Sequence, residues 1–164
     1  MAAPVDPASF RAAMARFPGA VTVVTTGQGA GRRGITATAV CSVTTEPPSL
    51  LVCLNRKTGT CSTVAESGRF NVNLVSGEAG PLALAFAGVG GVTGADKFRH
   101  GDWREDARGL PILGSAIAAF SCDVTETLEA GSHLIFIGRV CDITESVGAS
   151  LVYEQSRFHR LEPV

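Results

Sequence analysis

The sequence predicts a mainly β fold, a small antiparallel barrel with a few short helices at its edges. Nineteen glycines among 164 residues separate short runs that are rich in β-branched residues. Only two longer stretches repeat apolar residues at helical spacing. Because 45% of the residues are hydrophobic, a chain of this length can bury its own core. We therefore expect one domain over residues 1–164, with a loose N-terminal segment at 1–9.

An amphipathic helix should open the chain, because Asp6 followed by Pro7 suits an N-cap and a first helical turn. Apolar residues then recur at helical spacing, at Phe10, Ala13, Met14 and Phe17, before Pro18 and Gly19 end the run. A long β-hairpin should follow, from Val21–Thr26 through a glycine-rich tip to Ile35–Thr44.

The middle of the chain mixes strands and short helices. After two prolines, the aliphatic run Ser49–Asn55 suits a strand that is buried on both faces. A helical turn is predicted at Thr60–Glu66 and an alternating strand at Phe70–Val75. A second helix is predicted at Glu78–Ala87, with Pro81 in its first turn.

The last third should begin with a loop, because Gly88–Leu110 is polar and rich in turn residues. Two long strands are predicted at Ala116–Leu128 and His133–Thr144, joined by a short turn. Short strands at Leu151–Tyr153 and Phe158–Leu161 should close the chain.

Charge and hydropathy argue against several partners. A net charge of −1 supplies no field that would gather nucleic acid phosphates, so we expect no nucleic acid partner. The uncharged run Ala79–Ala95 holds Pro81 and five glycines, which is unlike a bilayer helix, so we expect no membrane partner. The N-terminus shows no cationic start followed by an apolar block, and a cytoplasmic location is the default expectation.

Cysteine and histidine usage points away from disulfides and metals. The five cysteines are odd in number and form no C-x-x-C motif, so we expect reduced, mostly buried thiols. The three histidines are scattered, and we expect no metal site. His100 with Asp102 could form a metal-binding or acid–base pair, but no third partner is in reach, and a surface loop explains both residues more simply.

Glycines 29, 31 and 34 spell the nucleotide-binding pattern G-x-G-x-x-G. That pattern has meaning only where a strand leads in and a helix leads out. Here the β-branched run after Gly34 predicts a hairpin tip instead, and Arg32 and Arg33 on that tip are interpreted as solvated charges.

Three groups of polar residues are candidates for chemistry. Thr36, Thr38 and Ser42 lie in an otherwise apolar stretch, and their hydroxyls must bond the backbone or line a ligand site. The segment 55–60 suits a phosphate, with Thr58 and Thr60 donating and Arg56 or Lys57 supplying charge, although a plain polar turn is an equal alternative. His133 opens an apolar strand, either as a donor at a reaction centre or as a satisfied edge residue.

Several longer stretches together resemble the short-chain flavin reductase family, the reductase components of two-component flavin-dependent monooxygenases. The resembling segments are FRAAMARFPGAVTVVTT from Phe10, GITATAVCSVTTEPPSLLVCLNR from Gly34, FNVNL from Phe70, GSHLIFIG from Gly131 and LVYEQSRFHRL from Leu151. They span about residues 10–161, and the weakest zone of the resemblance is Gly88–Leu110.

The resemblance implies an FMN-binding split β-barrel that forms a homodimer with two flavin sites at the subunit interface. It also implies an NAD(P)H-dependent flavin reductase of the EC 1.5.1 class. Hydride from NADH or NADPH would reduce FMN or FAD, and the reduced flavin would diffuse to a separate flavin-dependent monooxygenase.

Site residues follow from the resemblance in the same way. Thr36, Ala37 and Thr38 would contact the isoalloxazine edge, with Ser42 nearby. Asn55, Arg56, Thr58 and Thr60 would hold the ribityl chain and phosphate, and Lys97 and Phe98 would lie near the flavin tail. Tyr153 and Arg157 would reach the cofactor, and the catalytic His133 would hold the nicotinamide. Many members carry Gly-Asp-His where this chain has Ser132 in the middle, which puts the nicotinamide preference in doubt.

Two other functions stay open. A flavoprotein with tightly held FMN, acting in electron transfer or ferric reduction, would share the same site. A non-enzymatic flavin-binding protein would share it too but would lack turnover. The related pyridoxamine phosphate oxidase branch ranks low because no matching array of phosphate-binding arginines is visible.

Overall fold

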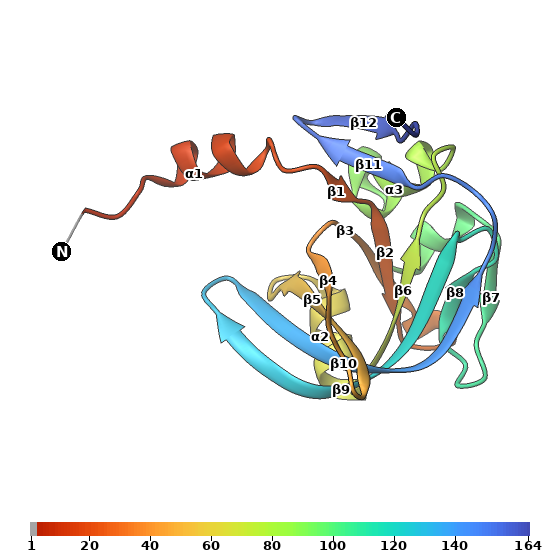
Figure 1. Ribbon diagram of the computed structural model, residues 1–164. Helices are drawn as coiled ribbons and strands as arrows, with labels where there is room; N and C mark the ends of the chain where they lie inside the picture. Colours follow the sequence, from red (N-terminus) through yellow and green to blue (C-terminus); the bar gives the residue numbers. More distant parts are fainter. Residues whose placement is uncertain (1–2) are drawn as a thin grey trace.

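A seven-stranded antiparallel sheet forms the centre of the protein, in the order β3-β2-β6-β9-β10-β5-β4 (Figure 1). The computed structural model describes residues 3–164. The strands of this sheet are β2 (Thr22–Thr26), β3 (Arg33–Ala37), β4 (Val40–Thr45), β5 (Pro48–Asn55), β6 (Arg69–Leu74), β9 (Ala118–Ala130) and β10 (His133–Glu145).

Short elements surround the sheet. The helices are α1 (Pro7–Met14), α2 (Gly59–Ser67) and α3 (Gly80–Phe86), with 3-10 turns η1 (Gly29–Gly31), η2 (Val89–Gly91) and η3 (Gly94–Arg99). The remaining strands are β1 (Gly19–Ala20), β11 (Leu151–Glu154) and β12 (Arg157–Arg160), which form one small sheet, and β7 (Trp103–Glu105) with β8 (Pro111–Leu113), which form another. The mainly β prediction is confirmed.

The N-terminal helix forms as predicted. The Asp6 carboxylate accepts from the N–H groups of Ala8 and Ser9 at 3.0 Å each, which caps the first turn. Because α1 begins at Pro7, it occupies the end of the segment expected to be loose; residues 1 and 2 lie outside the described range.

The predicted strand Ile35–Thr44 is wrong in one respect, because it is two strands at opposite edges of the sheet. The chain turns at 38–39, where the Val40 N–H donates to Thr38 O and the Cys53 N–H donates to Ala39 O. β3 then pairs with β2, and β4 pairs with β5. The described strands β3 and β4 share no ladder, so the sheet does not close into the predicted barrel.

The strand predicted to be buried on both faces alternates instead. Leu50, Val52 and Leu54 of β5 are buried, whereas Leu51 and Cys53 are half-buried. The buried face packs with residues of α2 and β6, but the other face has no comparable cover. The cysteine prediction is similarly mixed, since Cys61 and Cys122 are buried while Cys41 and Cys141 are exposed free thiols.

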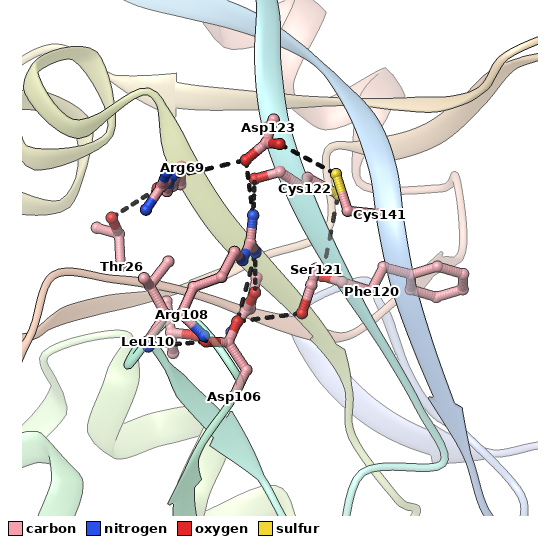
Figure 2. Close-up of polar contacts among 12 residues, drawn as sticks. Thr26, Arg69, Asp106, Arg108, Leu110, Phe120, Ser121, Cys122, Asp123 and Cys141 are labelled. Carbon is pink, nitrogen blue, oxygen red and sulfur yellow. Dashed lines mark hydrogen bonds and ion pairs between the residues drawn. The ribbon is translucent and has the colours of Figure 1, made fainter.

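The segment 88–110 winds through η2, η3 and β7, and a buried polar cluster holds its far end (Figure 2). The Asp106 side chain is 5% exposed and ion-pairs with Arg108 at 3.3 Å. Arg108 also donates to Asp123 over 2.7 Å and to the Asn71 amide oxygen over 3.1 Å. Ser121 lies 3.2 Å from the same Asp106 oxygen. This cluster fastens the loop to the strands β6 and β9.

The Asp106 carboxyl stays charged in this cluster. Burial by itself raises its pKa, but hydrogen bonds from the Leu110 N–H, the Asn71 amide and the Arg108 N–H, with the charge of Arg108, outweigh burial. The pKa of Asp106 is therefore lowered from its ordinary value of 3.8. A lowered carboxyl pKa contributes stability that is complete above the unfolded value and is lost as pH falls through the folded value.

None of the helices described in residues 3–164 combines the length and apolarity that a bilayer crossing requires.

Asp106→Asn should lower the free energy of unfolding by roughly 3 kcal/mol at about pH 7, because Arg108 loses one partner and keeps Asp123. The difference from the wild type should shrink as the pH falls below 3.8, because the unfolded carboxyl group then binds a proton while the native one is still charged, and it should be lost once the pH has fallen through the lower native pKa. Urea unfolding at neutral and acid pH measures both effects. Asp142→Asn, at an exposed position of β10, is the matched control and should change stability by less than about 0.5 kcal/mol. Equal stability of the two variants would contradict the role of the cluster.

Candidate functional site

A groove runs along the free edge of β3, where two cavities adjoin. The first, of about 300 Å³, is lined by Arg33, Gly34, Ile35, Thr58, Gly59, Thr60, Gly88, Val92, Thr93, Gly94 and Lys97. The second, of about 320 Å³, is lined by Val21, Thr36, Ala37, Thr38, Ala83, Leu84, Ala87, Val89, Tyr153 and Phe158. Neighbouring residues of β3 and of the α3–η2 segment line both cavities, so we treat them as two ends of one groove.

The first cavity is built for an anion. It opens at the N-terminus of α2, where Thr58 is the N-cap and accepts from the Cys61 N–H over 3.2 Å. Within residues 3–164, no group accepts from the N–H of Gly59 or of Thr60. Arg33 adds a permanent positive charge beside this turn. Free N–H groups at a helix start together with a cation are the usual components of a phosphate site.

Lys97 joins three elements at the same cavity. Its ammonium donates to Phe86 O over 2.9 Å and to Gly34 O over 3.3 Å, so η3 is tied to α3 and to β3. Burial lowers the pKa of Lys97 from its ordinary value. A bound anion would oppose that shift, because it favours the charged form of the lysine.

Gly34 allows β3 to approach the aromatic cluster of Phe86, Phe98 and Trp103. The Phe86 ring centroid lies 5.1 Å from both other rings. A Cβ at Gly34 would lie 2.5 Å from a Phe86 ring carbon, which is closer than real contacts allow. The floor of the first cavity therefore requires a glycine at position 34.

The second cavity is mainly apolar, and its polar side chains come from Thr36, Thr38 and Tyr153. The rings of Tyr153 and Phe158 lie 5.5 Å apart and form one wall. The Thr36 hydroxyl donates to Ala83 O over 2.6 Å and so fixes α3 to the strand. Because Gly34 turns its carbonyl to the free edge, alternation along the strand turns the N–H groups of Thr36 and Thr38 to the same side.

This groove fits a ligand that has an anionic group at one end and a flat, mainly apolar ring with polar edges at the other. FMN has this form, with a phosphate on a ribityl chain and an isoalloxazine ring. The cations, the helix start and the hydroxyls suit the phosphate, and the aromatic wall opposite free N–H groups suits the ring. The residues present are therefore compatible with a flavin.

Seven of the thirteen predicted site residues line the groove. Thr58, Thr60 and Lys97 lie at the first cavity, and Thr36, Ala37, Thr38 and Tyr153 lie at the second. Phe98 is buried behind the groove in the aromatic cluster, Ser42 lies on β4 at a separate apolar cavity, and Arg157 is exposed on β12.

Asn55, Arg56 and His133 lie together at the adjoining ends of β5 and β10, beside the groove and not among its lining residues. His133 pairs with Asn55 in the sheet, and the His133 Nδ1 is 2.9 Å from the Ser132 hydroxyl. The Asn55 side chain accepts from the Lys57 N–H over 2.9 Å. Arg56 ion-pairs with Glu129 at 2.8 Å. Their roles in ligand binding stay predictions.

Among the groove residues that the sequence reasoning missed, Arg33 and Phe158 matter most for a ligand. Arg33, predicted to be a solvated charge, lines the anion cavity, because the start of β3 lies beside the first turn of α2, where a Cβ on Gly59 would be 3.5 Å from Arg33 Nε. Phe158 is predicted only as a strand residue. It pairs with Tyr153 across the β11–β12 hairpin, and this pairing puts both rings on one face of the hairpin. Among residues 3–164, no three metal-ligating side chains lie close enough together to hold an ion.

Comparisons with known proteins agree over nearly the whole chain. Residues 14–162 match the family model described as flavin reductase like domain. The reductase component of 4-hydroxyphenylacetate 3-monooxygenase from Pseudomonas aeruginosa is 43% identical over 155 residues, which cover 94% of this chain and 91% of that protein. The FMN reductase (NADH) RutF from Ancylobacter novellus is 41% identical over 151 residues, covering 92% of this chain and 82% of that protein.

A solved structure shows the same fold. The NADH:FAD oxidoreductase SgcE6 of Streptomyces globisporus C-1027, in complex with NAD and FAD fragments, superposes with a TM-score of 0.88 at 29% identity. The superposition covers 99% of this chain and 98% of that one.

Gly34→Ala should lower the free energy of unfolding by about 1–3 kcal/mol, because the new methyl group overlaps the Phe86 ring. Gly31→Ala is the matched control, since a Cβ there meets nothing within 4 Å. Thermal or urea unfolding of both variants makes the comparison. If Gly34→Ala were as stable as Gly31→Ala, the close packing at the cavity floor would be disproved.

Proposed function

This chain belongs to the flavin reductase like family, and on that premise we propose that it is an NAD(P)H:flavin oxidoreductase that reduces FMN or FAD. The observation that carries the proposal is the two-ended groove on β3, with an anion site at one end and an aromatic-walled cavity at the other. The names of the relatives, one an FMN reductase and one a monooxygenase reductase component, support the same reaction class.

The chain's own residues position the reactants. Arg33, Lys97 and the start of α2 would hold the flavin phosphate, with the Thr60 hydroxyl donating to it. The Thr58 hydroxyl donates to Asn55 O over 2.8 Å, so Thr58 would contribute by shaping this turn. Tyr153 and Phe158 would hold one face or edge of the ring system. A bound flavin supplies the ring that accepts hydride from the nicotinamide, and the protein's main task is to hold the two rings in contact.

Backbone N–H groups at Thr36 and Thr38 would also act electrostatically. Hydride transfer increases negative charge on the pyrimidine side of the flavin ring. Donors already fixed in direction stabilise such charge without reorganising during the reaction. The chain needs no proton donor for the hydride step itself, so His133 is proposed to hold the nicotinamide and not to act as an acid.

We further propose that reduced flavin leaves the enzyme and reaches a separate flavin-dependent monooxygenase by diffusion. The ring end of the groove is made of neutral hydroxyl, backbone and apolar groups, which favours exchange over permanent retention. We propose that the working form is a homodimer in the cytoplasm, where metabolism supplies both NADH and NADPH.

A steady-state assay tests the proposal directly. The oxidation of NADH and of NADPH is followed by the absorbance of the reduced nicotinamide, with FMN, FAD or riboflavin added. Turnover that requires added flavin supports the proposal and ranks the substrates. A yellow protein that keeps its flavin through dialysis and reduces ferric complexes would favour the retained-flavin alternative. Flavin binding without any turnover would identify a non-enzymatic binding protein.

Arg33→Gln should weaken FMN binding by about 10- to 100-fold, the range for losing a hydrogen bond to a charged group. Riboflavin lacks the phosphate, so its dissociation constant should stay the same. Fluorescence titration measures both ligands on one preparation. Arg139→Gln, on the exposed side of β10, is the control and should leave both constants unchanged. A parallel Arg56→Gln variant decides whether that arginine also serves the phosphate. Equal weakening of FMN and riboflavin by Arg33→Gln would refute the assignment.

His133→Ala should raise the KM for the nicotinamide by about fivefold, which corresponds to roughly 1 kcal/mol for one neutral hydrogen bond. The dissociation constant for FMN should not change, since His133 does not line the groove. Steady-state kinetics and flavin titration separate the two effects. Unchanged kinetics would remove His133 from the site.

A further inference from the structure

Arg32 lies against an aromatic ring instead of extending into solvent. Its guanidinium carbon is 4.8 Å from the centroid of the Phe98 ring, within the range of a cation–π contact. The residue is half-buried, and the ion pairs found within residues 3–164 do not include it. The prediction that Arg32 is a solvated charge is therefore wrong, because the ring is the partner of its charge.

The Nε atom of Arg32 is buried without a hydrogen-bond partner. Within residues 3–164 it is the one buried side-chain nitrogen or oxygen atom in this condition. A buried N–H group that stays unpaired costs free energy, and the cost is larger in a charged group. Such an atom in a native structure requires an explanation. Here the side-chain position that leaves Nε unpaired is the one that places the guanidinium on the Phe98 ring.

Phe98 connects Arg32 to the floor of the anion cavity. It is 5% exposed and follows Lys97 directly in the 3-10 turn η3. Its ring packs edge-on against Phe86, with the two centroids 5.1 Å apart. A Cβ at Gly34 would lie 3.3 Å from the tip of the same ring. Phe98 therefore contacts Arg32 and the aromatic cluster at the cavity floor at the same time.

The position of Lys97 depends on how η3 lies against β3. The turn has only six residues, and no side chain caps its first N–H groups. The Lys97 ammonium reaches Gly34 O, over 3.3 Å, only while η3 stays beside β3. Arg32 lies between η1 and β3 in the chain, so its contact with Phe98 joins the hairpin tip to η3. This contact is a second tie between the turn and the strand, next to the lysine itself.

The two consecutive arginines have different surroundings. Arg33 and Gly34 line the anion cavity, whereas Arg32 does not. Successive side chains in an extended segment point to opposite faces. Arg33 accordingly lies beside Gly59 at the start of α2, and Arg32 lies on the side of Phe98. Arg33 can therefore touch a bound phosphate, while Arg32 acts on the cavity only through the ring.

We propose that Arg32 is a positioning residue for the anion cavity, which holds η3 against β3 through Phe98 and so keeps the Lys97 ammonium at the cavity. The inference rests on the proposed function and deepens it, because it names the contact that makes the site prefer phosphorylated flavins over riboflavin. Arg32 touches neither the flavin nor the nicotinamide in this arrangement. Its loss should weaken phosphate binding and leave the hydride step unchanged.

Hydrogen exchange on the flavin-free protein tests the contact itself. In Arg32→Gln the amides of η3 should exchange about tenfold faster, in line with the loss of a desolvated cation–π contact. Amides of β9 should keep their rates, which shows that the variant is folded. Arg99→Gln is the matched control, because Arg99 belongs to the same turn, its side chain is 81% exposed and its surface ion pair is worth little. Unchanged exchange of η3 in Arg32→Gln would overturn the proposal.

Ligand titration tests the consequence for the cavity. Arg32→Gln should raise the dissociation constant for FMN about tenfold and leave that for riboflavin unchanged, because riboflavin has no phosphate. The KM for FMN should rise by a similar factor, with kcat at saturating FMN within about twofold of the wild type. Arg99→Gln removes a nearby positive charge and should change neither constant by more than about twofold. Equal weakening of both flavins, or a large fall in kcat, would show a general structural role and contradict the proposal.

A double-mutant cycle tests whether the effect passes through the ring. Phe98→Leu keeps an apolar side chain and removes the aromatic face. If Arg32 acts through Phe98, Arg32→Gln should weaken FMN binding much less in the Phe98→Leu background than in the wild type. Independent, additive effects would mean that Arg32 acts on the phosphate directly, and the proposed role would be refuted.

These measurements separate the inference from the proposed function. Flavin-dependent NADH oxidation by the wild type, with Arg32→Gln behaving like Arg99→Gln, removes only the role of Arg32. Faster exchange of η3 in Arg32→Gln, with no flavin turnover by the wild type, removes the proposed function and leaves the contact between Arg32 and η3 established.

Discussion

The free edge of β3 is the constraint on which the groove depends. An edge strand leaves alternate backbone N–H and C=O groups without sheet partners, and each buried group needs one. Lys97 satisfies the carbonyl of Gly34, and the Thr36 hydroxyl links the strand to Ala83 of α3. The N–H groups of Thr36 and Thr38 point to the same free edge. An unpaired edge could otherwise pair with a strand of another chain. Here it forms the polar wall of the groove.

The groove also depends on a segment that has little regular structure of its own. Lys97 anchors the start of that segment to β3 and α3, and Asp106 with Arg108 anchors its end to the sheet. Both anchors are charged groups held by several hydrogen bonds, which gives a loop a defined position without a large apolar core. A segment fixed at two points can vary between them and still complete the anion cavity.

Binding and release make opposite demands on such a site. Two cations and a helix start suffice to orient a phosphate, whereas the ring end offers apolar contact and single hydrogen bonds. A site with charge concentrated at one end orients its ligand while keeping the total affinity moderate.

The sequence alone determined most of the elements of this protein, because apolar periodicity, Asp6 at a helix start, and prolines and glycines at turns act over short distances. It also predicted a ligand site that includes Thr36, Thr38, Thr58, Thr60 and Tyr153, through local patterns and a family resemblance, and these residues line the groove. The tertiary structure alone decided that 35–44 divides between two sheet edges, because both halves have equal β propensity and only pairing partners distinguish them. It also brought Arg33 to the anion cavity and left Arg56 with Glu129, since the position of a charge beside a ligand depends on which strands become neighbours.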